Sequence, residues 1–350
     1  MLLINAKINT NDNDNNLNTL EDFNRIYMKS NWKKVLYIHI PFCPQKCKYC
    51  ICKSIAGTSE DVISFVENKL FLQVESVHEH LNKIKFDEVY IGGGTPTFVP
   101  ASILRKLFDL IPNFRNIPKK CIEGSPNTFT LEHLELFQEY RFSFISIGIQ
   151  SLNKDICSWQ NRFWISQAQA ISMSDMLRES GIYFNYDLIC YMGKGDFRDI
   201  PAFEHDLDFI MDKCRPSSIN IHQMHQTEYT SEKMMKLIEI IRNSIEKHKE
   251  YECINSNLSD ADVYNDIVFQ SQYRLVRERR DFTHYMWNKY PEIPVYGYDI
   301  YSIGYTEKIF PNSNAGNIVY RPGRNTFKKV NYNEELYSEY HDIRREKELE

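Results

Sequence analysis

The stretch YIHIPFCPQKCKYCICKS, residues 37–54, places four cysteines within ten residues, directly after an apolar run. Their spacing is Cys43-x3-Cys47-x2-Cys50-x-Cys52. Thiolates this close in sequence must be bonded or neutralised, because several bare thiolates would repel one another. Structural zinc sites usually combine two Cys-x2-Cys pairs separated by a longer stretch, and no second pair occurs here. Three thiolates from one short loop favour a [4Fe–4S] cluster with one open iron, while zinc and redox-active thiols stay as alternatives.

The bulk composition is that of an ordinary soluble globular chain of 350 residues, with 42% hydrophobic and 25% charged residues. A formal net charge of -5 argues against a broad nucleic-acid surface. No apolar run has the length of a transmembrane helix, and the N-terminus lacks a signal-peptide pattern. We therefore expect a cytoplasmic protein without nucleic-acid or membrane partners. An odd count of nine cysteines in such a chain does not indicate a disulfide framework.

Short β-branched or aromatic runs alternate with helical patterns along the first two thirds of the chain. The runs predict strands over 35–40, 88–92, 120–124, 144–149, 183–189 and 218–224. The helical patterns cover 59–82, 101–111, 130–140, 166–180 and 201–213. This alternation predicts an α/β fold with a parallel sheet and right-handed crossovers, either an open sheet or a full or partial barrel.

The rhythm changes near residue 228, where we expect a domain boundary. Helices are predicted over 231–249 and 262–281, followed by a loop and strand segment over 291–325. The expected organisation is a flexible, Asn- and Asp-rich arm over 1–30 and a barrel domain over 31–228, followed by a smaller, mostly α domain over 229–350 that covers the substrate.

Each predicted strand ends in polar or glycine-rich residues. These ends are the cysteine loop, GGGTPT (92–97), EGSP (123–126), GIQS (148–151), Asp187 and HQMH (222–225). In parallel α/β barrels, sites are built at the carboxyl ends of the strands. Three consecutive glycines let a backbone approach a ligand closely, and the absence of a following Lys-Ser/Thr excludes a P-loop. Any one of these features could be an ordinary turn or salt bridge, but their shared rim favours a ligand site.

The cysteine spacing within YIHIPFC, followed by GGGTPT, resembles the radical SAM superfamily. More narrowly it is similar to the oxygen-independent coproporphyrinogen III oxidase-like (HemN-like) group, which includes heme chaperones and the class C radical SAM methylases and cyclopropanases. The resemblance covers about residues 35–225, with a weaker similarity in YDIYSIGYTEKIF (298–310). It implies a partial (β/α)6 TIM-like barrel.

The resemblance also implies a site. Cys43, Cys47 and Cys50 would hold three irons of a [4Fe–4S] cluster, and S-adenosylmethionine (SAM) would chelate the fourth. The implied contacts of one or two SAM molecules are Tyr37, Tyr49, Gly93, Gly94, Thr95, Glu123, Gln150, Arg162 and Asp187. Cys52 lies outside the ligand triad and, with Tyr37, is the implied catalytic residue. In this family one electron splits SAM into methionine and a 5′-deoxyadenosyl radical that removes a hydrogen atom from the substrate. A low-potential electron donor such as flavodoxin or ferredoxin is the expected partner.

Two segments depart from the oxidases of this group. The chain has DLICYMGKGD (187–196) where those enzymes read roughly Asp-Leu-Ile-Tyr-Gly-Leu-Pro-Gly-Gln-Thr, and HQMH where they have a Tyr-Ala-His-like run. These departures favour a tailoring enzyme of specialised metabolism that transfers a methyl or methylene group, or functionalises a C–H bond, on a small molecule. The alternatives are an oxygen-independent coproporphyrinogen III dehydrogenase of heme biosynthesis and a heme chaperone without turnover, with His39, His222 and His225 as candidate axial ligands.

Overall fold

The computed structural model describes residues 35–50, 52, 54–76, 78–224, 230–253, 273–277, 295–298, 304–305, 317–321 and 326–330. They fall into two compact units. The first comprises residues up to 42, residues 57–121 and residues from 282 onward; the second comprises 43–56 and 122–281. The predicted arm over 1–30 and His225 lie outside the described residues, and the boundary near 228 stays a prediction.

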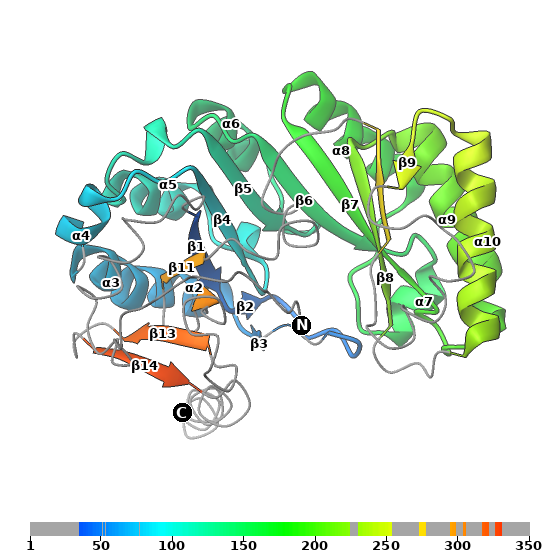
Figure 1. Cartoon of the computed structure of the whole chain (residues 1–350), viewed down its shortest axis with the longest axis horizontal. Helices are drawn as coiled ribbons and strands as arrows, with labels where there is room; N and C mark the ends of the chain where they lie inside the picture. The colour runs from blue at the N-terminus through cyan, green and yellow to red at the C-terminus, as the bar shows by residue number, and fades with distance from the viewer. Residues whose placement is uncertain are drawn as a thin grey trace, which may run out of the picture. The chain divides into compact units, whose positions relative to one another are not determined.

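Parallel strands form the centre of the first unit (Figure 1). Strand β1 (Val35–Ile40) pairs with β4 (Glu88–Gly93) on one side and with β11 (Val295–Tyr298) on the other, both in parallel. Burial of β1 and β4 agrees with their near-continuous apolar sequences, since parallel strands are covered on both faces. The remaining elements of this unit are β2 (Phe42–Cys43, whose second residue begins the other unit), α2 (Ser59–Phe65), the π-helical turn η1 (Val66–Leu70), α3 (Phe71–Ser76), α4 (His78–Lys83), the 3-10 turns η2 (Pro96–Phe98) and η3 (Phe114–Asn116), α5 (Ala101–Leu110), β12 (Gly304–Tyr305), β13 (Asn317–Arg321) and β14 (Thr326–Val330).

The helix predicted over 59–82 is present as several segments. It begins at Thr58, whose hydroxyl accepts from the Asp61 N–H while the Asp61 carboxylate accepts from the Thr58 N–H. This reciprocal capping box satisfies two backbone donors that a helix start leaves unpaired. A π-helical turn at Val66–Leu70 then separates α2 from α3. Inserting such a turn shifts the helical phase, which a sequence pattern of constant period does not predict.

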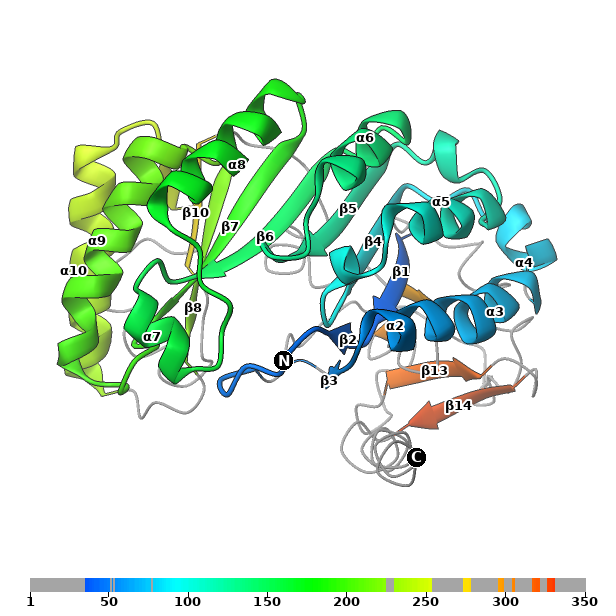
Figure 2. The ribbon, with the colours of Figure 1, turned by 180° about the vertical axis from the view of Figure 1, so that it is seen from behind.

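The second unit is built on strands β6 (Phe144–Gln150), β7 (Tyr183–Cys190) and β8 (Ser218–Gln223), paired in parallel (Figure 2). Helices α8 (Gln167–Glu179) and α9 (Ile200–Phe209) pack on β7, and α10 (Ser231–Lys247) packs on α9. The buried Tyr186 hydroxyl contacts Ser174 of α8 at 2.7 Å. The other elements are β3 (Ile55–Ala56), α6 (Leu131–Glu139), α7 (Lys154–Trp159), the 3-10 turn η4 (Phe197–Asp199), the π-helical turn η5 (Ile210–Cys214), β9 (Glu252–Cys253) and β10 (Tyr273–Val276).

All six strands predicted between residues 35 and 224 are present, and their ends agree to within one residue. The sixth, β5 (Lys119–Gly124), lies where the chain passes from the first unit to the second. The predicted α/β class is therefore confirmed. Helix α7 was not predicted, because its six residues, KDICSW, are too few to show a helical period.

One prediction in the C-terminal region is wrong. Residues 262–281 were expected to be helical, but Tyr273–Val276 form strand β10, which pairs antiparallel with β8 and β9. Leu275 and Val276 are buried in this position. Pairing covers the edge of β8, whose backbone groups would otherwise stay exposed, and this gain outweighs the helical pattern of the sequence around it. The described residues after 253 are all in strands except Arg277, so among the described residues of 229–350 the expected helical character is present only in α10 (Ser231–Lys247).

Candidate functional site

The cysteine loop of the second unit is fastened to the turn that follows α7. The Lys48 N–H donates to the Gln160 carbonyl at 2.9 Å. The Gln45 side chain donates to the Asn161 carbonyl at 3.0 Å, and the Asn161 side chain donates back to the Lys46 carbonyl at 2.9 Å. These contacts join segments more than 110 residues apart and hold the cysteine loop against the turn after α7.

The four cysteines of the loop form no disulfide and differ in exposure. Cys47 is buried, Cys43 and Cys50 are half-buried, and Cys52 is exposed. A hydrogen bond from Cys52, outweighing partial burial and helped by the positive charge of Lys46, lowers the pKa of Cys50 to about 5. The same hydrogen bond, with Cys50 as its acceptor, raises the pKa of Cys52. The loop therefore carries thiolate character at Cys50, a predicted ligand, and disfavours it at Cys52, which was predicted to be outside the ligand triad.

Arg162 connects this loop to two strand ends. Its guanidinium donates to the Ser125 hydroxyl at 2.9 Å and to the Gly148 carbonyl, and it lies 3.9 Å from the Cys47 sulfur. A cation beside Cys47 stabilises negative charge on that sulfur. The predicted residues Cys47 and Arg162 are thus brought together, 115 residues apart in sequence.

Tyr49 lies between the cysteine loop and the ends of β7 and β8. It packs against an apolar cluster formed by Ile189, Met192 and Met224. Burial raises the pKa of the Tyr49 hydroxyl. The ring covers this apolar cluster on the side of the cysteine loop.

Gln150 ends β6 in a left-handed conformation, with φ of 70°, at a bulge in the pairing with β7. A Cβ added to Gly148 would lie 2.6 Å from the Gln150 amide nitrogen and 3.3 Å from Arg162, so only glycine leaves room for both side chains. The buried Gln150 Oε1 and Arg162 Nε have no hydrogen-bond partner among the described residues. Buried polar atoms are nearly always paired, so two such atoms around one glycine point to a polar ligand.

Asp187 of β7 is surrounded by protein donors. Its carboxylate accepts from Ser146 at 3.1 Å, from Asn185 at 2.7 Å and from Asn220 at 2.8 Å, and His222 lies 3.5 Å from it. Gly148 is its partner on β6. The predicted SAM contact of Asp187 stays a prediction, and a ligand there would share a carboxylate that is already well bonded.

The glycine turn after β4 is described within the first unit. Gly94 N–H donates to the Ile40 carbonyl at 2.8 Å, and the N–H of Thr95 donates to the Phe42 carbonyl at 2.9 Å. Gly93 has a φ of 117°, which side chains rarely tolerate. A Cβ on Gly94 would lie 2.7 Å from the Phe42 carbonyl oxygen. This turn therefore packs backbone to backbone on the residues that immediately precede Cys43 in the chain.

Several other predicted residues have less defined roles. Glu123 is half-buried at the end of β5 and its negative charge contributes to the raised pKa of Cys52. Tyr37 lies in β1 opposite Tyr90. Of the candidate heme ligands, His39 is 6% exposed and sits beside Gly93, and His222 faces Asp187. Heme ligation by these two histidines stays a prediction.

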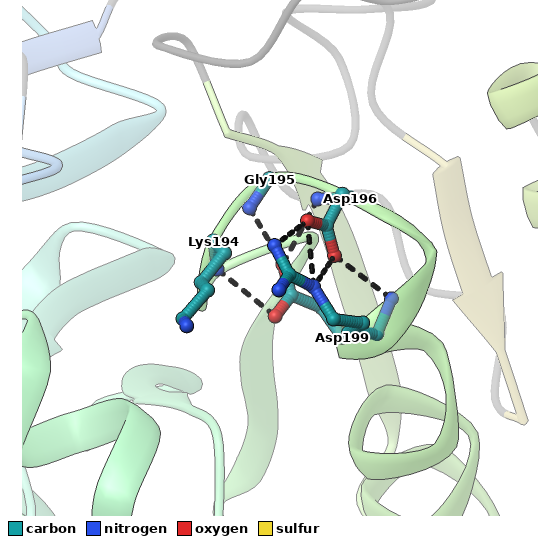
Figure 3. A network of polar contacts seen from close by, with 5 residues as sticks. Lys194, Gly195, Asp196 and Asp199 are labelled. Carbon is teal, nitrogen blue, oxygen red and sulfur yellow. Dashed lines mark hydrogen bonds and ion pairs between the residues drawn. The ribbon is translucent and has the colours of Figure 1, made fainter.

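The loop after β7 is held by one buried carboxylate (Figure 3). Asp199 accepts from the backbone N–H groups of Lys194 at 2.9 Å, Gly195 at 2.6 Å and Asp196 at 3.3 Å. A Cβ on Gly193 would lie 2.1 Å from the same carboxylate, so this position requires glycine. The segment that departs from the oxidases is therefore a compact loop with its own internal anchor.

The residues present fit a [4Fe–4S] cluster and SAM. The donor set is three cysteines of one loop, one of which, Cys47, lies beside the Arg162 guanidinium. The unpaired Gln150 Oε1 and Arg162 Nε are polar atoms that SAM could satisfy. The cysteines of a cubane cluster each bind a different iron, which three cysteines of one loop can do.

Sequence reasoning missed three residues of this site. Ser125 bonds Arg162, Asn161 bonds the cysteine loop, and Gln160 lies buried beneath it. The amide of Gln160 donates to the Met192 carbonyl at 2.6 Å, which ties the cysteine loop to the loop after β7. Asn161 has a φ of 50°, and Gly or Asn is the usual residue in this left-handed conformation. The asparagine before Arg162 was therefore the sequence signal for a turn at this position.

Comparison with known proteins shows which family this chain resembles. Residues 37–207 match the family described as the radical SAM superfamily. The oxygen-independent coproporphyrinogen-III oxidase-like protein HemZ of Bacillus subtilis is 31% identical over 54% of this chain and 38% of its own length. The oxygen-independent coproporphyrinogen III oxidase of Bradyrhizobium diazoefficiens is 30% identical over 44% and 35%, and the heme chaperone HemW of Buchnera aphidicola is 26% identical over 54% and 50%.

The fold has a matching solved structure. The coproporphyrinogen III oxidase HemN of Escherichia coli superposes with a TM-score of 0.58 at 17% identity, over 81% of this chain and 67% of that one. The chain spans half or less of the length of the three curated relatives named above. No helix among the described residues is long and apolar enough to cross a membrane.

Proposed function

From the premise that residues 37–207 are a radical SAM domain of the HemN-like group, we propose that this protein cleaves SAM reductively and abstracts hydrogen from a tetrapyrrole of the porphyrinogen class. The observation that carries the SAM chemistry is the arrangement of Cys47 and Arg162 beside the unpaired Gln150 oxygen. The names of the relatives support the substrate class, since the oxidases among them act on coproporphyrinogen III.

Each of the described residues would have a distinct role. Cys43, Cys47 and Cys50 would hold the cluster, and Arg162 would offset the negative charge that collects on the thiolates. Gln150 Oε1 and Arg162 Nε would bond polar atoms of SAM, which would satisfy both. When bound, the cluster and SAM supply one-electron cleavage of SAM and removal of a hydrogen atom from an unreactive C–H bond. Tyr49 would keep water away from the loop.

The tailoring reaction is the second candidate, and the loop after β7 favours it. This loop is anchored on Asp199 and has no counterpart of the Gly-Leu-Pro segment of the oxidases. A rebuilt loop at a strand end changes which substrate fits, since sites of such folds are formed there. In this candidate a methyl or methylene group, supplied by a second SAM molecule, would be transferred to another small molecule.

The test is anaerobic reconstitution followed by incubation with SAM and dithionite. We expect about four irons per chain and formation of 5′-deoxyadenosine. Adding coproporphyrinogen III should raise the rate of SAM cleavage and yield decarboxylated porphyrinogen. Absence of 5′-deoxyadenosine and of S-adenosylhomocysteine under strong reductant would overturn the SAM chemistry. SAM cleavage without porphyrinogen turnover would leave the tailoring candidate, and tight heme binding without cleavage would indicate a chaperone.

A further inference from the structure

Two large aromatic side chains are exposed on the turn that braces the cysteine loop. Trp159 is 59% exposed and Phe163 is 46% exposed. Across the part of the chain that the structure describes, the large hydrophobic residues with such exposure are Leu72, Leu131, Trp159, Phe163, Phe197 and Met235. Trp159 and Phe163 are the two that flank a single turn. Exposed aromatic residues gathered in this way are typical of protein interaction surfaces.

Lysines lie over two tryptophan rings of this region. The ammonium of Lys48 lies 5.1 Å from the centre of the Trp159 ring, and that of Lys154 lies 5.5 Å from the centre of the Trp164 ring. We call Lys48, Lys154, Trp159 and Phe163 the aromatic–lysine patch. The protein carries a formal net charge of -5, so a basic patch is a local reversal of its charge. Such a reversal steers an acidic partner to one place on the surface.

The patch is continuous with the cysteine loop, and both belong to the second unit. Lys48 directly follows Cys47 in sequence, and its backbone donates to the carbonyl of Gln160, the neighbour of Trp159. Cys47 is buried beside Arg162, whereas Lys48 is exposed. Of these two neighbouring residues of the loop, the first therefore faces the interior and the second faces the solvent. A molecule seated on the patch therefore contacts Lys48, the residue next to Cys47, a predicted ligand of the cluster.

We propose that the aromatic–lysine patch is the docking surface for an acidic one-electron donor protein. The inference rests on the proposed function, because it supplies the reductant that SAM cleavage consumes. One electron passes from the donor to the cluster, so the donor is oxidised by one electron, the cluster is reduced by one electron and no bond forms or breaks. Trp159 and Phe163 supply the apolar contact that holds the complex, and the lysines supply attraction and orientation.

Charge and position favour a donor over a macromolecular substrate. Electron transfer weakens steeply with distance, so a donor needs the outer side of the cysteine loop. A substrate instead needs the carboxyl-terminal part of the strands, where β6 ends at Gln150 and β7 carries Asp187. The patch is formed by Lys48 of the cysteine loop, by α7 and by the turn after α7, and it contains no residue of the predicted SAM site.

The experiment compares two reductants on the reconstituted full chain. Trp159→Ala/Phe163→Ala and Lys48→Glu are each assayed for SAM cleavage with an acidic flavodoxin, kept reduced by its reductase, and with titanium(III) citrate. The flavodoxin Kd is measured separately by calorimetry. We expect the double variant to raise this Kd about 30-fold, as for loss of an interface hot spot, and to leave the titanium-driven rate within twofold of wild type. Lys48→Glu should slow flavodoxin-driven cleavage and flatten its dependence on salt.

Matched controls are Phe197→Ala, an aromatic residue of similar exposure at 43%, and Lys69→Glu, an exposed lysine of the first unit. Both should leave the flavodoxin Kd unchanged. An unchanged Kd in the double variant would overturn the docking proposal, and so would an equal loss of titanium-driven cleavage, which would place the patch in the cluster or substrate site. Failure of wild type to cleave SAM with titanium citrate would refute the proposed function instead, and the calorimetric Kd would still decide the docking surface.

Discussion

Replacing Gly94 by alanine adds one methyl group at the point where the glycine turn meets the residues before Cys43. The new Cβ would lie 2.7 Å from the Phe42 carbonyl oxygen, 2.8 Å from the Pro41 carbonyl oxygen and 2.9 Å from the Phe42 carbonyl carbon. All three are backbone atoms, so no side chain can rotate away to relieve the contact. Ordinary contact begins near 3.4 Å, so the two backbones must separate by about 0.7 Å (3.4 minus 2.7).

The magnitude follows from two losses. Forcing a methyl group into a packed site raises the free energy of the folded state by about 1–3 kcal/mol. Separation also stretches the hydrogen bonds from Gly94 to Ile40 and from Thr95 to Phe42, which contribute about 0.5–1.5 kcal/mol each. The expected loss of stability is therefore about 2–6 kcal/mol, a large share of what a domain has. Cys43 follows Phe42 directly, so the affinity for iron should fall as well.

Urea unfolding of the apo protein, followed by circular dichroism, measures the first effect, and iron content after reconstitution measures the second. Gly181→Ala is the matched control, because Gly181 has a φ of 75° but no atom within 4 Å of the added Cβ. It should lose only about 1–2 kcal/mol from the left-handed backbone and keep its iron. If Gly94→Ala unfolded within 0.5 kcal/mol of wild type and bound iron normally, the backbone packing of this turn would not have the importance argued for it.

Three further predictions concern the second unit. Cys47→Ala should abolish cluster assembly, whereas Cys52→Ala should retain about four irons per chain; a full cluster in Cys47→Ala would show that the ligand assignment is wrong. In Gln160→Glu the ionised side chain cannot donate to the Met192 carbonyl, and a charge is buried. Thermal denaturation should therefore show a loss of at least about 3 kcal/mol in the free energy of unfolding, and a clearly smaller loss in the uncharged variant Gln160→Met. Burial raises the pKa of Asp206 in the folded protein above its value of about 3.9 in the unfolded chain. The contribution of this group to folding stability is therefore complete below a pH of about 3.9, and it is lost as the pH rises through the folded pKa. Asp206→Asn should remove this dependence, which has a slope of at most about 1.4 kcal/mol per pH unit, and an identical pH profile of urea unfolding in both proteins would contradict the assignment.

The sequence by itself determined the elements that depend on local patterns. Parallel strands buried on both faces need near-continuous apolar runs, and runs such as FISIGIQ predicted six strands to within one residue. Thr58 and Ser166 cap their helices through residues three positions on, which is an equally local effect, although the helix patterns alone did not identify these caps. The cysteine spacing likewise predicted a metal site, because three ligands in one loop are a property of the chain and not of its packing.

Only the tertiary structure decided which side chains meet. The contact of Arg162 with Cys47 spans 115 residues, and no local pattern encodes it. Strand β10 forms because the edge of β8 is there to be covered, and the sequence of residues 262–281 alone predicted a helix. The same holds for Gln150, whose unpaired oxygen is a consequence of a bulge opposite β7 and of the space that Gly148 leaves. Local propensities determine elements over a few residues, whereas a binding site depends on register and on packing between elements, which only the folded chain defines.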